Sequence, residues 1–164
     1  MSTLDASRMQ STADASLDRR GQLLRSLSLL LVGVGLAVTG YMTYNKLSGQ
    51  TLPCTNEGLI NCAVVENSAW ASVLGVPTAT WGLLAHLTIG ALLLFDRRVG
   101  FLREYGLLML FGLTLFGTLY HSYLIYVSFS ILQALCPWCL AAAAVMLAQL
   151  IVTGIRLRRS IISA

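Results

Sequence analysis

Four cysteines are the residues of this chain best suited to chemistry, and they fall into two pairs. Cys54 and Cys62 have seven residues between them, whereas Cys136 and Cys139 frame the motif Cys-Pro-Trp-Cys. Pro137 suits the first position of a helix, where its missing N–H costs nothing, so Cys136 is the expected cap residue and Cys139 lies in the first turn. Unpaired N–H groups and the positive end of the helix dipole stabilise a thiolate there. A stabilised thiolate favours thiol–disulfide exchange.

Metal binding and inert cross-links are the other uses of four cysteines. Four-thiolate zinc sites favour two close pairs with two to four residues between partners, and only the second pair has that spacing, so no metal site is predicted. Structural disulfides explain the loop pair better than the Cys-Pro-Trp-Cys pair. The sequence has no glycine-rich nucleotide motif, and neither His86 nor His121 has a second residue at ligand spacing. The expected electron acceptor is therefore a quinone dissolved in the membrane.

The elements that must position these thiols are membrane helices. The chain has 164 residues, of which 56% are hydrophobic and 11% are charged, and its mean hydropathy is +0.73. Soluble domains carry about 25% charged residues, so the composition excludes a soluble enzyme. Four apolar runs, each long enough to cross a hydrocarbon core of about 30 Å, cover about residues 24–47, 76–95, 105–131 and 136–155. Runs of this length without strict alternation form helices.

The predicted fold is therefore an all-α membrane protein, a four-transmembrane-helix bundle over residues 23–157 with a long loop between helices 1 and 2. Residues 1–22 are polar and are expected to form a disordered cytoplasmic tail, and residues 158–164 a second tail. Within the loop, the segment from Cys62 to Leu74 predicts a short amphipathic helix ended by Gly75, with Pro77 opening the second span. Its apolar side would cover the membrane mouth, while Glu66 and the following Asn would face water. Glycines in the spans predict points of close helix contact, at Gly33, Gly35, Gly40, Gly112 and Gly117.

The basic residues indicate how the spans are oriented. Ten of the eleven lie before the first span, between the second and third, or after the fourth, and Lys46 is the exception. Because basic residues gather on the cytoplasmic side, both termini are expected in the cytoplasm and all four cysteines outside it, where disulfides persist. The net charge of +4 then reports orientation, and no nucleic-acid partner is implied. The ten are Arg8, Arg19, Arg20, Arg25, Arg97, Arg98, Arg103, Arg156, Arg158 and Arg159.

At this point the sequence resembles the vitamin K epoxide reductase family, in its bacterial form without a fused thioredoxin domain. The resemblance covers about residues 24–155. It rests on the four spans, on both cysteine pairs in this order, on the stretch Asn-Ser-Ala-Trp-Ala-Ser-Val-Leu-Gly-Val-Pro at 67–77, and on Tyr-Leu-Ile-Tyr at 123–126. The resemblance implies that Cys139 lies next to the quinone and that Cys136 exchanges with the Cys54/Cys62 pair. It further implies that the loop pair passes its disulfide to a separate thioredoxin-like, DsbA-like protein.

The resemblance also suggests residues for the quinone site. Ser68 matches the family's loop hydroxyl near the quinone, and its alternative reading is a solvent-facing or capping serine. Thr78 stands where some members have Asn, and Ala143 where the vertebrate enzyme has Tyr; these departures concern epoxide reduction and leave generic quinone reduction unaffected. An intramembrane histidine is a candidate proton relay or a neutral hydrogen-bonding group, and a tryptophan is a quinone contact or an interfacial anchor. The predicted quinone-binding residues are Ser68, Thr78, Trp81, His121 and Cys139.

The expected activity is that of a quinone-dependent thiol–disulfide oxidoreductase of the bacterial inner membrane, supporting disulfide formation in exported proteins. The quinone would be of the ubiquinone, menaquinone or phylloquinone type. Two alternatives are a non-enzymatic membrane protein with structural disulfides, and reduction of vitamin K epoxide or quinone as the main activity. The DsbB family performs the same overall reaction, but there the helix-end pair precedes the loop pair, and here it follows.

Overall fold

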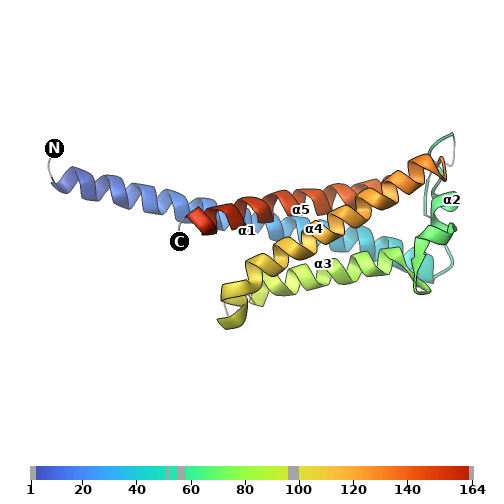
Figure 1. The fold of residues 1–164 in the computed structure, drawn as a ribbon, viewed down its shortest axis with the longest axis horizontal. Coiled ribbons are helices and arrows are strands. Elements are labelled where there is room, and N and C mark those ends of the chain that lie inside the picture. The colour runs from blue at the N-terminus through green and yellow to red at the C-terminus, as the bar shows by residue number, and fades with distance from the viewer. Residues whose placement is uncertain (1–2, 51, 55–57, 96–99, 163–164) are drawn as a thin grey trace.

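The computed structural model describes residues 3–50, 52–54, 58–95 and 100–162, with the backbone alone for residues 3–18, 20 and 100–104. Its long elements are the helices α1 (Thr3–Leu47), α3 (Thr78–Phe95), α4 (Gly100–Ser130) and α5 (Pro137–Ile162), which run side by side (Figure 1). Each contains a stretch long and apolar enough to cross a membrane, namely Gly21–Leu47, Thr78–Phe95, Tyr105–Ser130 and Pro137–Ile162. The predicted all-α four-helix membrane bundle is confirmed.

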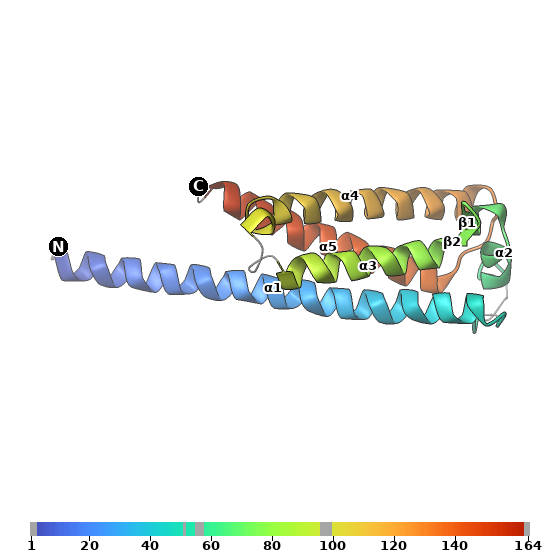
Figure 2. The same ribbon diagram turned by 90° about the horizontal axis from the view of Figure 1, so that it is seen from below.

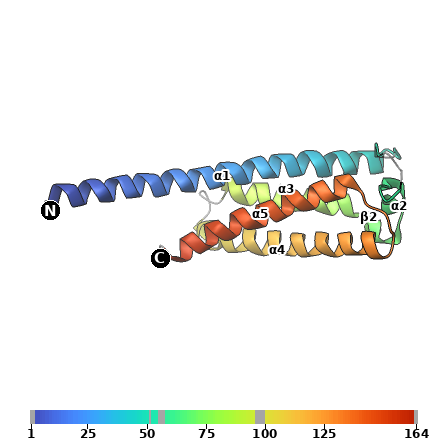
Figure 3. The same cartoon turned by 90° about the horizontal axis from the view of Figure 1, so that it is seen from above.

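The two ends of the bundle carry different parts of the chain. The first residues of α1 and α4 and the last residues of α3 and α5 lie towards one end, and α2 and the two short strands cover the other (Figure 2). Helix α5 packs against α1 and α4, and α1 also packs against α3 (Figure 3). The core of the bundle is an apolar cluster that draws on all four helices: Val32, Ile89, Leu93, Leu110 and Met146. A second buried cluster, Met42, Leu52, Cys62 and Cys136, lies at the covered end.

Close helix packing is visible where glycines meet bulky side chains. A Cβ atom at Gly35 would collide with the ring of His86, which is 1% exposed and whose Nδ1 donates to the carbonyl oxygen of Gly82 over 2.8 Å. A Cβ atom at Gly117 would come within 3.0 Å of the Met146 side chain. Two of the predicted contact glycines thus have that role. Gly33 and Gly112 do not, since no described heavy atom lies within 4 Å of the added Cβ, and Gly40 meets only Leu83 at an ordinary 3.8 Å.

The outermost helices extend further than the apolar pattern predicts. Helix α1 begins at Thr3, so the backbone of residues 3–22 is helical where the sequence predicts a disordered tail. Helix α5 likewise continues to Ile162, through most of the expected tail 158–164. Adding a residue to an existing helix gains a hydrogen bond without a new nucleation step, which the apolar span has already provided. Residues 1–2 and 163–164 of these tails, and Arg97 and Arg98 of the orientation pattern, lie outside the described residues.

The predicted single amphipathic helix between the first two spans is wrong in its extent. Helix α2 covers only Cys62–Glu66, and a 3₁₀ turn follows at Ala69–Ala71. The strands β1 (Ser72–Val73) and β2 (Val76–Pro77) then pair in an antiparallel hairpin. Its two turn residues, Leu74 and Gly75, have φ angles of 55° and 78°, the left-handed values that a tight two-residue hairpin turn requires. Gly75 therefore closes a hairpin and does not end a helix.

Candidate active site

Backbone hydrogen bonds tie the loop that carries Cys62 to the segment that precedes α5. The N–H of Leu135 donates to the carbonyl oxygen of Leu59 over 2.7 Å, and the N–H of Asn61 donates to the carbonyl oxygen of Leu135 over 3.1 Å. Ile60 and Leu135 form a parallel β-bridge between these bonds. Asn61 and Leu135, the residues that immediately precede Cys62 and Cys136, are thereby held together although they are far apart in the sequence.

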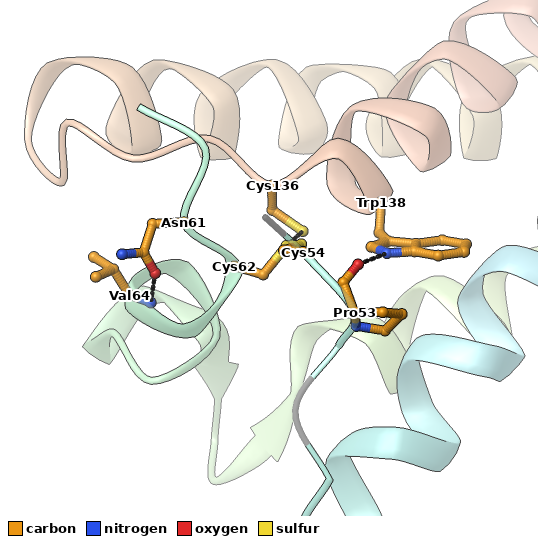
Figure 4. The surroundings of a disulfide bond; sticks show 7 residues. All are labelled: Pro53, Cys54, Asn61, Cys62, Val64, Cys136 and Trp138. Atoms are coloured by element: carbon orange, nitrogen blue, oxygen red, sulfur yellow. Dashed lines mark hydrogen bonds between the residues drawn. A yellow bond between two sulfur atoms is a disulfide. The ribbon is translucent and has the colours of Figure 1, made fainter. Parts of the chain in front are cut away.

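The four cysteines form a short row at the covered end of the bundle. Cys54 and Cys62 are joined in a disulfide with their Cα atoms 6.0 Å apart, and Cys136 and Cys139 are free thiols. The sulfur of Cys62 lies 3.5 Å from that of Cys136, although 74 positions separate the two residues (Figure 4). Cys62 is 1% exposed and Cys136 2%, whereas Cys54 and Cys139 are half-buried. Each pair thus has a buried member that faces the other pair.

The start of α5 shapes the chemistry of its two thiols. The helix begins at Pro137, and the N–H of Leu140 donates to the carbonyl oxygen of Cys136 over 3.0 Å, so Cys136 occupies the cap position as expected. A hydrogen bond from the Cys139 thiol lowers the pKa of Cys136 to about 7, helped by the N–H groups of Cys139 and Trp138 and opposed by burial. The sulfur that receives the helix-end N–H groups is therefore that of Cys136, whereas the sequence pattern pointed to Cys139.

Trp138, between the two helix cysteines, holds the other loop cysteine in place. Its Nε1–H donates to the carbonyl oxygen of Pro53 over 3.4 Å, next to Cys54. Its ring also lies 5.0 Å from that of Tyr41 at the end of α1. The sequence pattern predicted no role for this tryptophan, although its place between the two motif cysteines was the signal available.

A cavity of about 540 Å³ lies beside the helix pair, between the helices and the covering segment. Cys139 is on its wall, and every other predicted quinone-binding residue lines it as well: Ser68, Thr78, Trp81 and His121. Most of the remaining wall is apolar, with Met42, Val65, Leu113, Phe116, Leu124 and Met146 among its residues. Cys54, Cys62 and Cys136 are not among the lining residues. Of the four cysteines, the structure thus brings Cys139 to the wall of an apolar cavity.

The polar groups of this wall are held by bonds to the backbone. The Ser68 hydroxyl donates to the carbonyl oxygen of Val65 over 2.8 Å, and Nδ1 of His121 donates to that of Gly117 over 2.8 Å. Trp81 Nε1–H donates to the carbonyl oxygen of Val73 over 3.4 Å. Ser68 precedes the 3₁₀ turn but makes no capping bond to it, so its cap interpretation is not supported.

Glu66 departs from the expectation that it faces water. Its side chain is half-buried and lines the cavity. Burial raises the pKa of its carboxyl group, although the N–H of Leu52 and the charge of Lys46 act in the opposite direction. Lys46 Nζ donates to the carbonyl oxygen of Glu66 over 2.8 Å and to Oδ1 of Asn67 over 3.3 Å. Glu66 follows the buried Cys62 by four positions in α2, so the two side chains lie on the same, inward face of that short helix.

Comparison with known families accounts for this arrangement. The model of the vitamin K epoxide reductase family matches residues 26–154, which is most of the chain. The chain belongs to the vitamin K epoxide reductase family. All four cysteines and every predicted quinone-binding residue fall inside the match. Members of the vitamin K epoxide reductase family are redox oxidoreductases, so the facing cysteine pairs belong to an oxidoreductase of the membrane.

Proposed function

We propose that this protein is a quinone-dependent thiol–disulfide oxidoreductase that supports disulfide formation in exported proteins. The observation that carries the proposal is the 3.5 Å contact between the sulfurs of Cys62 and Cys136, with Cys139 on the wall of an apolar cavity. A structural disulfide needs no neighbouring thiol in reach, and an isolated dithiol needs no partner disulfide. Their juxtaposition in the buried end of the bundle supports exchange between the two pairs.

The first half of the reaction oxidises a partner protein at the loop pair. A thiolate of a separate thioredoxin-like, DsbA-like protein attacks the sulfur of Cys54, which is more exposed than Cys62, and forms a mixed disulfide while Cys62 leaves as a thiolate. The partner's second thiolate then attacks its own sulfur in that mixed disulfide. Cys54 leaves, the partner carries the new disulfide, and the loop pair holds the two electrons.

The second half moves those electrons along the row of sulfurs. The Cys62 thiolate attacks Cys136 in an oxidised Cys136–Cys139 pair, and Cys139 leaves on the cavity side. Cys54 then attacks Cys62, which restores the loop disulfide and releases Cys136 with its lowered pKa of about 7. The result is the state that the structure describes, with a loop disulfide and a helix dithiol.

The helix dithiol would be reoxidised by a quinone of the ubiquinone, menaquinone or phylloquinone type. The apolar wall fits such a ring and excludes water from it. Cys139 would face the ring, with Ser68, Thr78, Trp81 and His121 as polar or aromatic contacts. As Cys136 and Cys139 close their disulfide, they give up two electrons, and the quinone is reduced to the quinol.

The orientation proposed for the bundle follows from its charges. The cysteines lie at the end of the bundle opposite both termini. Five described basic side chains lie on α1 and α5 toward the end with the termini: Arg19, Arg25, Arg156, Arg158 and Arg159. The positive-inside rule then places both termini in the cytoplasm and the cysteines outside the bacterial inner membrane. That side is oxidising and holds the exported partner proteins.

A test of the proposal separates the two halves of the reaction. The full chain in detergent is supplied with a reduced DsbA-like protein and ubiquinone-1, and quinone reduction is followed by absorbance. Cys139→Ser should lower the rate by several orders of magnitude, as removal of a nucleophile does, while the loop disulfide still oxidises the partner once. A Cys139→Ser variant that reduces quinone at the wild-type rate would contradict the scheme. If the redox state of Cys136 and Cys139 does not change when quinone is added, a purely structural role for the cysteines would be favoured.

A further inference from the structure

Reduction of a quinone in the cavity needs two protons, and at a pH where Cys136 is a thiolate the helix pair supplies only one. Above the Cys136 pKa of about 7, the Cys136 sulfur is a thiolate and only the Cys139 thiol carries a proton. Closing the disulfide therefore releases two electrons but one proton. A second proton has to reach an apolar chamber from a group on its wall or from water.

A smaller polar cavity offers a route for that proton. It has a volume of about 210 Å³ and lies against the quinone cavity, sharing with it the wall residues Lys46, Glu66, Ser68, Ala71 and Pro77. Asn67 and Ser72, both exposed, complete its lining. Of the shared wall residues, Glu66 is the only one that can release a proton as a carboxylic acid.

We propose that Glu66 is the proton donor for quinone reduction, passing a proton from the polar side cavity to the quinone cavity as the Cys136–Cys139 disulfide closes. The inference rests on the proposed function. The balanced step takes the Cys136 thiolate, the Cys139 thiol, the Glu66 carboxylic acid and the quinone, and yields the disulfide, the Glu66 carboxylate and the quinol. Water in the side cavity reprotonates the carboxylate when the helix pair is next reduced, so Glu66 stays ionised while the disulfide is closed.

The charges around Glu66 support this assignment. The carboxyl group and the two helix sulfurs interact electrostatically, so a negative charge on one disfavours a negative charge on the other. A Cys136 thiolate therefore favours a protonated Glu66. Formation of the disulfide removes the thiolate charge and allows Glu66 to ionise at the moment when the proton is required.

The other groups that face Glu66 leave it free to act as an acid. From α1, Lys46 lies near enough to favour the carboxylate, but its ammonium donates to the carbonyl oxygen of Glu66 and to Asn67. From the preceding loop, the N–H of Leu52 donates to the carboxyl group. From α4, Tyr120 and His121 stand on the wall of the same cavity. Burial outweighs the charge of Lys46 and the bond from Leu52, so the pKa of Glu66 is raised.

Glu66→Gln is the variant that tests the donor. Its amide oxygen still accepts the bond from Leu52, so the loop anchor is retained, but the side chain has no acidic proton. With dithiothreitol as donor and ubiquinone-1 as acceptor, quinone reduction should fall about 100-fold, a typical value for loss of general acid catalysis. Glu66→Asp should recover part of the rate. Glu57→Gln removes the same charge from the same loop and should leave the rate unchanged.

The dependence of the rate of quinone reduction on pH distinguishes proton donation by Glu66 from a structural effect of the substitution. In the wild type the reaction needs both a Cys136 thiolate and a protonated Glu66, so the profile should be bell-shaped. In Glu66→Gln the falling limb should vanish, leaving a rate that rises with pH and then stays level. A rate within twofold of the wild type, or a uniform loss with an unchanged profile, overturns the inference.

Infrared spectroscopy provides a readout that needs no quinone. In a Cys54→Ala/Cys62→Ala background only the helix pair changes redox state. Its reduced-minus-oxidised spectrum should show the carbonyl band of a protonated carboxyl group, and Glu66→Gln should remove that band while Glu57→Gln keeps it. A band that persists in Glu66→Gln overturns the inference. A wild-type protein that reduces no quinone would instead overturn the proposed function, whatever the infrared result.

Discussion

The two cysteine pairs differ in how the fold supports them. The helix pair sits at the start of α5, with Cys136 as the cap residue and Cys139 in the first turn of a 26-residue helix packed against α1 and α4. The loop pair is held by a five-residue helix, a β-bridge and a few backbone hydrogen bonds. Elements with few buried contacts open at low free energy, while packed helices do not. In the proposed relay, the helix pair would form the more rigid half, and the loop pair the half that opens at lower free energy to meet the proposed protein partner.

Within each pair, burial separates the two sulfurs. Cys62 and Cys136 are fully buried and face each other, whereas Cys54, bonded to Cys62, and Cys139, hydrogen-bonded to Cys136, are half-buried. Cys139 alone of the four lines the apolar cavity. This order supports the proposed path of the electrons, from Cys54 through the buried contact to Cys139, which two exposed pairs would not define.

The largest expected effect breaks the pairing of the two buried sulfurs. The variant Cys54→Ala/Cys139→Ala keeps Cys62 and Cys136 and should oxidise almost completely to a disulfide between them, because their sulfurs are 3.5 Å apart. The matched variant Cys62→Ala/Cys136→Ala should retain two free thiols. Thiol alkylation followed by mass spectrometry reports both states. Equal cross-linking in the two variants would show that the pairs do not meet through their buried members.

The second test concerns the acidity of the helix pair. In Cys54→Ala/Cys62→Ala the thiolate absorbance should rise with pH around a midpoint of about 7, the pKa of Cys136. About a tenth of the Cys136 sulfur should be ionised at pH 6 and about nine-tenths at pH 8. The sign follows from deprotonation, since the thiolate forms as the pH rises. Adding Cys139→Ala should move the midpoint upward, because the Cys139 hydrogen bond is the largest cause of the lowered pKa. If the midpoint does not move, the lowered pKa of Cys136 would be due to the N–H groups at the start of the helix alone.

The third test weakens the bundle that carries the helix pair. Gly35→Ala forces a methyl group against the His86 ring and should cost about 1–3 kcal/mol, as overpacking does. Gly33→Ala lies on the same helix with open space around it and should be neutral or slightly stabilising. Thermal melting in detergent compares the two. In Gly35→Ala the Cys62–Cys136 cross-link should still form below the melting temperature, and equal melting of both variants would contradict the packing argument.

The smallest expected effect concerns the support of the loop pair. Asn61 caps α2, its side-chain oxygen accepting from the N–H of Val64 over 3.1 Å, one residue before Cys62. Asn61→Ala should cost about 1 kcal/mol locally. Amide hydrogen exchange in α2 should quicken while that of α5 stays unchanged. Quickening in both elements would mean that the two supports are not independent.

Much of the fold was accessible from local sequence properties. Four apolar runs predicted the four spans, because crossing a hydrocarbon core requires a length of helix that can be counted along the chain. The extent of the loop helix was predicted wrongly, since periodicity over Cys62–Leu74 cannot reveal that Leu74 adopts a positive φ and closes a hairpin. The inward position of Glu66 follows from its place four positions after the buried Cys62 in α2, and it was missed because Glu66 was assigned to the water-facing side of a longer helix.

The candidate site divides in the same way. Cysteine type and spacing, and the proline that starts α5, predicted a reactive helix pair and a cap at Cys136 because these are properties of a few adjacent residues. The family resemblance implied that Cys136 meets the loop pair and that Cys139 lies at the quinone, but only the tertiary structure decided that Cys62 is the loop cysteine facing Cys136 and which cavity Cys139 lines. Cys62 and Cys136 are 74 positions apart in the sequence, and the distance between their sulfurs depends on how the β-bridge between Ile60 and Leu135 holds the loop over the bundle. The sequence by itself determined the helices and their reactive groups, and the packing determined which groups meet.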